Sequence, residues 1–268
     1  MRPCRTSGSA TRRAGRRGAA VATGDRRAFA ATARAGRTAA AALCVVAAAA
    51  ALLSGCGGHP GPRVLFIGNS FTAYNGGLDV ELHDLDPSCT TSNVAIGGAT
   101  LCRQWQLGLA LKAIRGSHWD YVVLQEQSQT PVIDRPLFAQ YAARFNAAIE
   151  ESGARTVLLM TWQRPDSLMA GVTTANLSAA YRGVGATLGA KVAPAGEAFA
   201  AALLARPDIM LNQIDGHPTP AGTYLAACVV YRTIVGRSPV GLTYADPAVP
   251  PDVRAFLQGI AEQSTTGG

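Results

Sequence analysis

Short apolar segments rich in β-forming residues alternate with longer segments of helical periodicity between residues 63 and 235. Apolar runs of this length between helical stretches are typical of βαβ units that build a parallel sheet. Strands are expected at residues 63–68, 91–95, 120–124, 156–160 and 191–193. Right-handed crossovers would place helices on both faces of the sheet. The sequence therefore predicts an α/β fold, a three-layer αβα sandwich around a mostly parallel sheet of about five strands.

The expected helices carry apolar residues at three- and four-residue spacing. In one of them, Phe138, Tyr141, Phe145 and Ile149 fall on a single face, which is the pattern of a helix packed on a core. The helices are expected at residues 78–85, 104–115, 136–152, 173–188, 197–205 and 219–235.

Residues 1–55 have a composition different from the rest of the chain. They hold ten Arg and one acidic residue, and an Ala-rich apolar run ends at Leu53-Ser54-Gly55-Cys56. A basic start, a short apolar run and small residues at its end indicate a removed export signal, because the run is too short for a comfortable membrane span. We expect a tether at 56–62, a single domain at 63–263 and a tail at 264–268. Both the general and the twin-arginine export routes stay open, as does a translation start downstream of Met1.

Charge and cysteine content agree with this division. Residues 56–268 carry 14 Lys and Arg against 16 Asp and Glu, so the basic character belongs to the leader and gives no reason to expect nucleic-acid binding. Cys89 and Cys102 flank one loop segment and are the expected disulfide pair in an oxidising compartment, whereas Cys228 is expected as a buried thiol. No cluster of Cys and His has zinc-ligand spacing.

Two segments carry candidate chemistry. The first strand runs into Gly68-Asn69-Ser70, which places a serine beyond the carboxyl end of a parallel strand, where ligands bind in open sheets. The last long helix is preceded by a loop that holds His217, with Asp215 two residues before it. A serine, a histidine and an aspartate in this arrangement predict a nucleophile, its base and the group that orients the base.

These segments resemble the conserved blocks of the SGNH, or GDSL-like, serine hydrolase superfamily, in a branch with Gly-Asn-Ser-Phe-Thr in the first block. The resemblance gives Ser70 the place of the nucleophile and His217 that of the base. In the second block, residues 93–100, it gives Gly98 the place of the glycine whose N–H faces the oxyanion. It implies a flavodoxin-like fold and ester hydrolysis through an acyl-enzyme, without a metal or an organic cofactor.

Two features depart from the pattern of the superfamily. The third block usually supplies an Asn to the oxyanion hole, whereas this chain has Gln125-Glu126-Gln127 after the third strand. A Gln amide offers the same N–H donors on a longer arm, so we expect Gln125 or Gln127 to substitute. The superfamily also places the Asp three residues before the His; with Asp215 two residues before His217, either Asp215 or a backbone carbonyl orients the imidazole.

The leader carries a resemblance of its own. Residues 53–56 resemble the bacterial lipobox, which implies that Cys56 is lipidated and becomes the first residue of a lipoprotein anchored at the cell envelope, facing the periplasm or the exterior. The expected function is an exported serine esterase that acts on small-molecule or carbohydrate esters. A surface binding protein that has lost turnover and a lipase or phospholipase of the same fold remain alternatives, and the oligomeric state stays open.

Overall fold

The structure, a computed structural model, describes residues 61–244 and 246–264, which lie in one compact unit. The expected export signal, the lipidation site Cys56 and most of the expected tether lie outside the described residues. No helix within the described residues is both long and apolar enough to cross a membrane.

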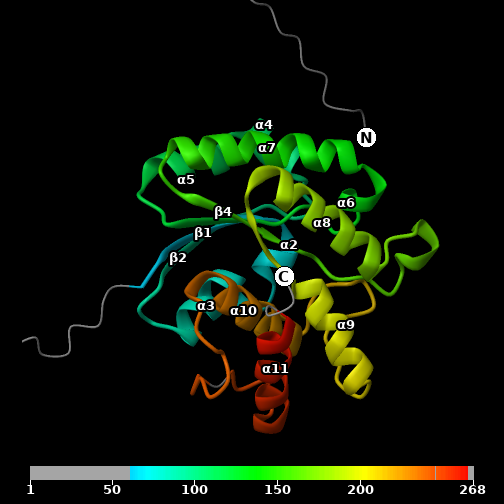
Figure 1. The fold of residues 1–268 in the computed structure, drawn as a ribbon. Helices are drawn as coiled ribbons and strands as arrows, with labels where there is room; N and C mark the ends of the chain where they lie inside the picture. Colours follow the sequence, from blue (N-terminus) through cyan, green and yellow to red (C-terminus); the bar gives the residue numbers. More distant parts are fainter. Residues whose placement is uncertain (1–60, 245, 265–268) are drawn as a thin grey trace, which may run out of the picture. The chain divides into compact units, whose positions relative to one another are not determined.

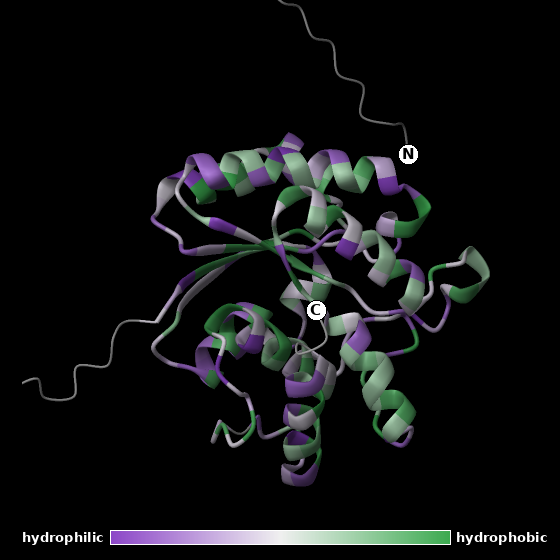
Figure 2. Ribbon diagram, in the orientation of Figure 1, coloured by the Kyte–Doolittle hydropathy of each residue, from purple (hydrophilic) through white to green (hydrophobic). Residues whose placement is uncertain are grey.

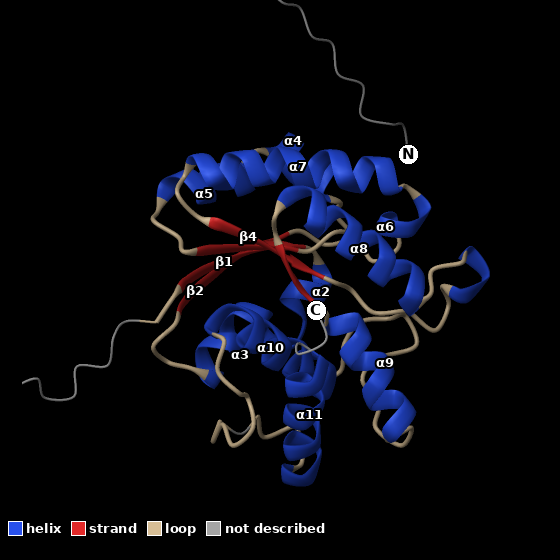
Figure 3. Cartoon of the chain, in the orientation of Figure 1, coloured by secondary structure: helices blue, strands red, loops and turns tan. Residues whose placement is uncertain are grey.

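Five parallel strands form one sheet at the centre of the domain (Figure 3). Their order is β2-β1-β3-β4-β5, which is the flavodoxin-like order. The strands are β1 (Arg63–Gly68), β2 (Thr90–Ala95), β3 (Tyr121–Leu124), β4 (Arg155–Leu159) and β5 (Lys191–Ala193). The α/β fold class and the parallel sheet predicted from the sequence are confirmed.

Helices cover both faces of the sheet (Figure 1). One layer is formed by α4 (Leu101–Leu107), α5 (Leu109–Gly116), α7 (Arg135–Glu151) and α8 (Thr174–Leu188). On the other face lie α3 (Leu78–Leu85) and α10 (Pro220–Val235), and α9 (Ala195–Ala205) and α11 (Pro251–Ser264) pack against α10. The connection from β1 to β2 contains α3, and the connection from β2 to β3, which contains α5, crosses the sheet in the opposite direction. Because both connections are right-handed, α3 and α5 lie on opposite faces of the sheet.

The core lies on both sides of the two central strands. Residues 64–67 of β1 and 122–124 of β3 are buried, as parallel strands covered by helices require. Helix α10 is apolar along most of its length (Figure 2) and is buried almost all round, because α3, α9 and α11 enclose it. Three aromatic rings, Phe71, Trp162 and Phe199, stack in sequence between the sheet edge and α9.

The structure differs from the expected elements in several places, of which three concern longer segments. The helix expected at residues 104–115 is two helices, α4 and α5, because Gly108 adopts a left-handed conformation (φ 74°) that ends one and begins the next. A short helix, α6 (Thr130–Ile133), lies in the segment after β3 that was expected to be a loop. Helix α11 was not expected, although Leu257, Ile260 and Ala261 at its buried face have helical spacing.

The cysteine pairing predicted from the sequence is wrong. Cys89 is a buried free thiol, so it does not pair with Cys102. Cys228 is a buried free thiol in α10, as expected. Burial raises the pKa of the Cys89 thiol to about 11 and also raises that of Cys228, so both are protonated, unreactive thiols at neutral pH.

Candidate active site

The candidate site lies where three neighbouring strands end at one edge of the sheet. Gly68 at the end of β1 pairs with Ala95 at the end of β2, and Ile67 pairs with Leu124 at the end of β3. The chain leaves β1 toward β2 on one side and returns to β3 on the other. The crevice between β1 and β3 is therefore the topological switch point, where ligands bind in folds of this type.

Asn69 shapes the turn that carries Ser70. It is the N-cap of α2 (Ser70–Ala73), and its side-chain oxygen accepts a hydrogen bond from the backbone N–H of Phe71 at 3.0 Å. Its amide nitrogen donates to the carbonyl of Ala99 at 3.1 Å. Asn69 thus fixes the half-buried Ser70 at the start of a helix and joins this turn to the loop after β2.

Ser70, His217 and Asp215 form one hydrogen-bonded chain. Ser70 Oγ lies 2.9 Å from His217 Nε2, and His217 Nδ1 lies 2.9 Å from Asp215 Oδ2. Because a carboxylate accepts the proton on Nδ1, Nε2 is left as the acceptor for the Ser70 hydroxyl, which is the tautomer a general base needs. The same imidazole, and the backbone N–H of His217 that donates to Asp215 Oδ1, lower the pKa of Asp215.

The loop that carries His217 is held from two sides. Tyr74 stacks on the imidazole with ring centroids 4.5 Å apart. Asn75, which has a left-handed backbone (φ 53°), donates to the carbonyl of Pro218 at 3.0 Å. On the other side, Trp162 Nε1 donates to the carbonyl of Gly216 at 3.0 Å. The orientation of His217 therefore depends on segments that follow both β1 and β4.

Two backbone N–H groups are available as oxyanion donors. Among the described residues, neither the Ser70 N–H nor the Gly98 N–H has a hydrogen-bond partner. Gly98 has φ of 65° in a turn closed by the hydrogen bond from Ala99 N to the Ile96 carbonyl, and it lies in the loop that Asn69 contacts. The Ser70 N–H adjoins the nucleophile, and an unpaired N–H on the loop that Asn69 contacts is a candidate for the second donor of an oxyanion hole.

The two glutamines expected to complete this hole make other contacts. Gln125 is buried, and its Oε1 accepts hydrogen bonds from Asn69 N and from the Thr72 hydroxyl, both at 2.9 Å. Its amide nitrogen donates to the carbonyl of Glu126. Gln127 Oε1 accepts from Gln129 N at 2.9 Å and so closes a local turn. In this geometry Gln125 acts as a tie beneath the Ser70 turn through its Oε1, while its amide nitrogen is engaged by the Glu126 carbonyl.

Comparison with known proteins agrees with the fold. No family model matches the chain, and no curated protein matches it. Among solved structures, a protein from Slackia heliotrinireducens that is assigned to the SGNH hydrolases is 28% identical, with a TM-score of 0.58 over 65% of this chain and 98% of that one. The chain belongs to the SGNH, or GDSL-like, hydrolase superfamily.

Other SGNH-like structures share the fold at lower identity. A DUF4886 family protein from Bacteroides uniformis is 20% identical, with a TM-score of 0.66 over 77% of this chain and 95% of that one. An acetyl xylan esterase, AlAXEase, is 16% identical, with a TM-score of 0.54 over 64% of this chain and 99% of that one. Together these comparisons support a hydrolase.

Several residues around the SGNH site were not anticipated from the sequence. Asn75, Trp162 and Gln104 look like ordinary loop or helix residues, yet Gln104 Nε2 donates to the carbonyls of Gly68 and Val94 and so joins the ends of β1 and β2. Only the tertiary fold brings them to the site. Glu126 lies two residues after the buried strand β3, where a carboxylate is unusual, so its position in the sequence gave a signal.

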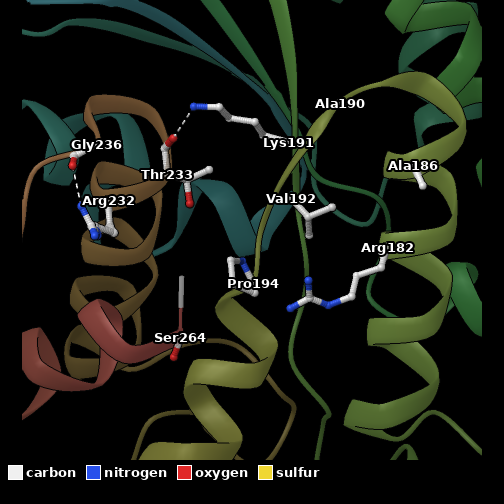
Figure 4. A pocket seen from close by; sticks show the side chains of 10 residues that line it. All are labelled: Arg182, Ala186, Ala190, Lys191, Val192, Pro194, Arg232, Thr233, Gly236 and Ser264. Carbon is white, nitrogen blue, oxygen red and sulfur yellow. Dashed lines mark hydrogen bonds between the residues drawn. The ribbon is translucent and has the colours of Figure 1, made fainter. Parts of the chain in front are cut away.

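A separate hollow of about 530 Å³ lies at the free edge of β5, and no residue of the candidate site lines it (Figure 4). Its basic side chains are already engaged within the protein. Lys191 donates to the carbonyl of Thr233, Arg232 donates to that of Gly236, and Arg182 pairs with Glu197. The described residues also contain no group of His, Cys, Asp and Glu arranged as metal ligands.

Proposed function

We propose that this protein is a serine esterase that hydrolyses carboxylic esters through an acyl-enzyme on Ser70. The observation that carries the proposal is the hydrogen-bonded chain of Ser70, His217 and Asp215 beside two unpaired backbone N–H groups. This is the set of groups that acyl transfer requires: a nucleophile, a base, an orienting carboxylate and donors for the developing oxyanion.

The geometry assigns each step to a named atom. His217 Nε2 takes the hydroxyl proton as Ser70 Oγ forms a bond to the ester carbonyl carbon, and the carbonyl electron pair moves to the oxygen. The N–H groups of Ser70 and Gly98 donate to that oxyanion. When the C–O bond to the alcohol breaks, His217 returns its proton to the leaving oxygen. Water then attacks the acyl-enzyme with His217 again as base, and Ser70 is released as a hydroxyl.

We propose small acyl groups on carbohydrate as the substrate class. An acetyl xylan esterase has the same fold, and the expected position at a cell envelope would bring the site to acylated polysaccharides. A lipase or acylhydrolase from Enterococcus faecalis also shares the fold, at 15% identity, so a longer acyl chain is the rival. Turnover of p-nitrophenyl esters from acetate to octanoate, with Ser70→Ala as the control, decides between them, and a rate highest for octanoate would contradict the carbohydrate substrate.

We further propose that the chain is exported and anchored through a lipid on Cys56. The support is the lipobox-like sequence at residues 53–56 after a basic and apolar leader. Two acyl chains on one residue suffice for stable membrane attachment. Cys56→Ser should leave the chain unprocessed or release it from the membrane fraction, and mass spectrometry of the wild-type N-terminus would contradict the proposal if it found an unlipidated chain cleaved at another residue.

A further inference from the structure

Glu126 is a fully buried carboxylate beside the candidate site, with an exposed fraction of 0%. No cation is among the groups that act on it within the described part of the chain. An isolated buried charge is costly unless hydrogen bonds satisfy it, so its presence in a core position calls for a physical reason.

The hydrogen bonds of Glu126 reach two segments. Its Oε1 accepts from the backbone N–H of Gln127 at 2.7 Å and from that of Leu101 at 3.1 Å, and its Oε2 lies 3.3 Å from the same Leu101 nitrogen. Leu101 is the first residue of α4 and directly follows the loop that contains Gly98. The carboxylate therefore fixes the C-terminal end of the loop that supplies one of the two oxyanion donors.

The neighbouring residue fixes the other donor. Gln125 Oε1 accepts the N–H of Asn69, which directly precedes Ser70. Two consecutive residues at the end of β3 thus hold the loop of Gly98 and the turn of Ser70 at the same time. The separation of the two backbone donors depends on this pair of residues.

A carboxylate suits this position better than the amide of the same shape. Oε1 accepts both backbone N–H groups and Oε2 shares the Leu101 N–H, so a Gln would place an NH₂ group, which cannot accept, within reach of that donor. Hydrogen bonds to an ionised acceptor are also about twice as strong as neutral ones.

We propose that Glu126 is a positioning residue, whose carboxylate holds the Gly98 loop at the distance from Ser70 that the oxyanion hole requires. The inference rests on the proposed esterase function for its catalytic consequence. Glu126 touches neither substrate nor Ser70 Oγ, and it acts through Leu101 and Gly98.

The role makes catalysis sensitive to the charge of Glu126. Burial raises its pKa to about 7, the N–H groups of Gln127 and Leu101 oppose this rise, and the charge of Asp134 at the start of α7 adds to it. Tyr181 on α8 also acts on Glu126 electrostatically. As the pH falls through about 7, the carboxylate takes up a proton and the hydrogen bonds to Leu101 and Gln127 weaken. The kcat profile should then contain a step near pH 7 that comes from Glu126.

The test compares Glu126→Gln with Glu81→Gln in the full-length protein. Glu81, on α3, is a matched control because it is also buried and burial likewise raises its pKa to about 7, whereas the side chains that act on it, Asp84, Tyr244 and Asp246, lie outside the candidate site. Loss of one oxyanion donor reduces kcat about 10²–10³-fold, so misplacing one should reduce kcat roughly 10- to 100-fold with KM changed less than about threefold. As the pH falls through about 7, kcat of the wild type and of Glu81→Gln should drop toward the level of Glu126→Gln, and this step should be missing from the profile of Glu126→Gln.

A second readout does not depend on turnover. In the wild type, the backbone amide resonances of Leu101 and Gln127 should titrate together near the pKa of Glu126, and this transition should vanish in Glu126→Gln. Absence of the shared transition would overturn the inference whatever the kinetics show, as would a folded Glu126→Gln variant with the kcat and the pH profile of the wild type. If the wild type hydrolyses no ester, the proposed function fails separately, and the amide titration alone decides whether Glu126 holds the loop.

Discussion

Replacing Gln125 by Ala separates two roles for this residue. If Gln125 is a tie beneath the Ser70 turn, the substitution leaves the Asn69 N–H and the Thr72 hydroxyl without their acceptor in a buried place. If Gln125 instead donates to the oxyanion in place of the usual Asn, the substitution removes a donor that matters only in the transition state. The first role predicts a loss of stability, and the second predicts a loss of kcat with stability unchanged.

The structure sets the size of the expected effect. Each buried donor left unpaired costs about 1–3 kcal/mol, so two of them should lower the free energy of unfolding by about 2–6 kcal/mol. With a urea m-value of about 2 kcal/mol/M, the unfolding midpoint should fall by roughly 1–3 M. We expect kcat of the folded variant, measured with p-nitrophenyl acetate, to fall roughly 10- to 100-fold, as for a misplaced oxyanion donor and less than for a lost one.

Gln127→Ala is the control for this experiment, because its Oε1 accepts only from the nearby Gln129 and Thr130 in a partly buried turn. Its free energy of unfolding should change by about 1 kcal/mol or less. The reasoning is refuted if Gln125→Ala keeps wild-type stability while kcat falls by about 10²–10³-fold, which is the size of one lost oxyanion donor.

Three further predictions concern residues around the triad. Asp215→Asn should reduce kcat less than the loss of Ser70, because water can reach a side chain that is 60% exposed, and a loss as large as that of Ser70→Ala would contradict this. Trp162→Phe keeps the ring stack but removes the hydrogen bond to the Gly216 carbonyl, so the free energy of unfolding should fall by about 1 kcal/mol, and an unchanged urea midpoint would show that this bond contributes nothing. Burial raises the pKa of Glu126 from 4.5 to about 7, so the folded state binds its proton more tightly than the unfolded state, and stability should fall as the pH rises through this interval. The free energy of unfolding, measured in urea at pH 5 and at pH 8, should differ less between these two pH values in Glu126→Gln than in the wild type. An equal difference in the two proteins would exclude a raised pKa of Glu126.

The sequence was sufficient for the architecture because its signals are local and strong. The apolar strands and the helical periodicity gave the parallel sheet, and the turn after β1 and the loop before α10 located Ser70 and His217. Where a signal was weak, the expectation failed. Gly108 reads as one residue within a helical pattern, and its left-handed backbone becomes evident only from the two helices that it separates.

The polar contacts around the site were less accessible from the sequence. Strand alternation placed Gln125 at the sheet edge. It did not reveal whether the amide oxygen or the amide nitrogen of Gln125 faces the Ser70 turn, since that depends on where Asn69 N and Thr72 lie. Pairing of Cys89 with Cys102 was inferred from their separation in sequence, whereas disulfide formation depends on the distance and direction of their Cβ atoms in the fold.

The central claim is that Ser70 is the nucleophile activated by His217. Labelling with a fluorophosphonate, followed by peptide mass spectrometry, tests it most directly, because the reagent bonds to an activated serine and leaves a stable adduct. We expect one adduct on Ser70 in the wild type, none in Ser70→Ala and greatly slowed labelling in His217→Ala. An adduct on another residue, or labelling of Ser70→Ala at the wild-type rate, would contradict the claim.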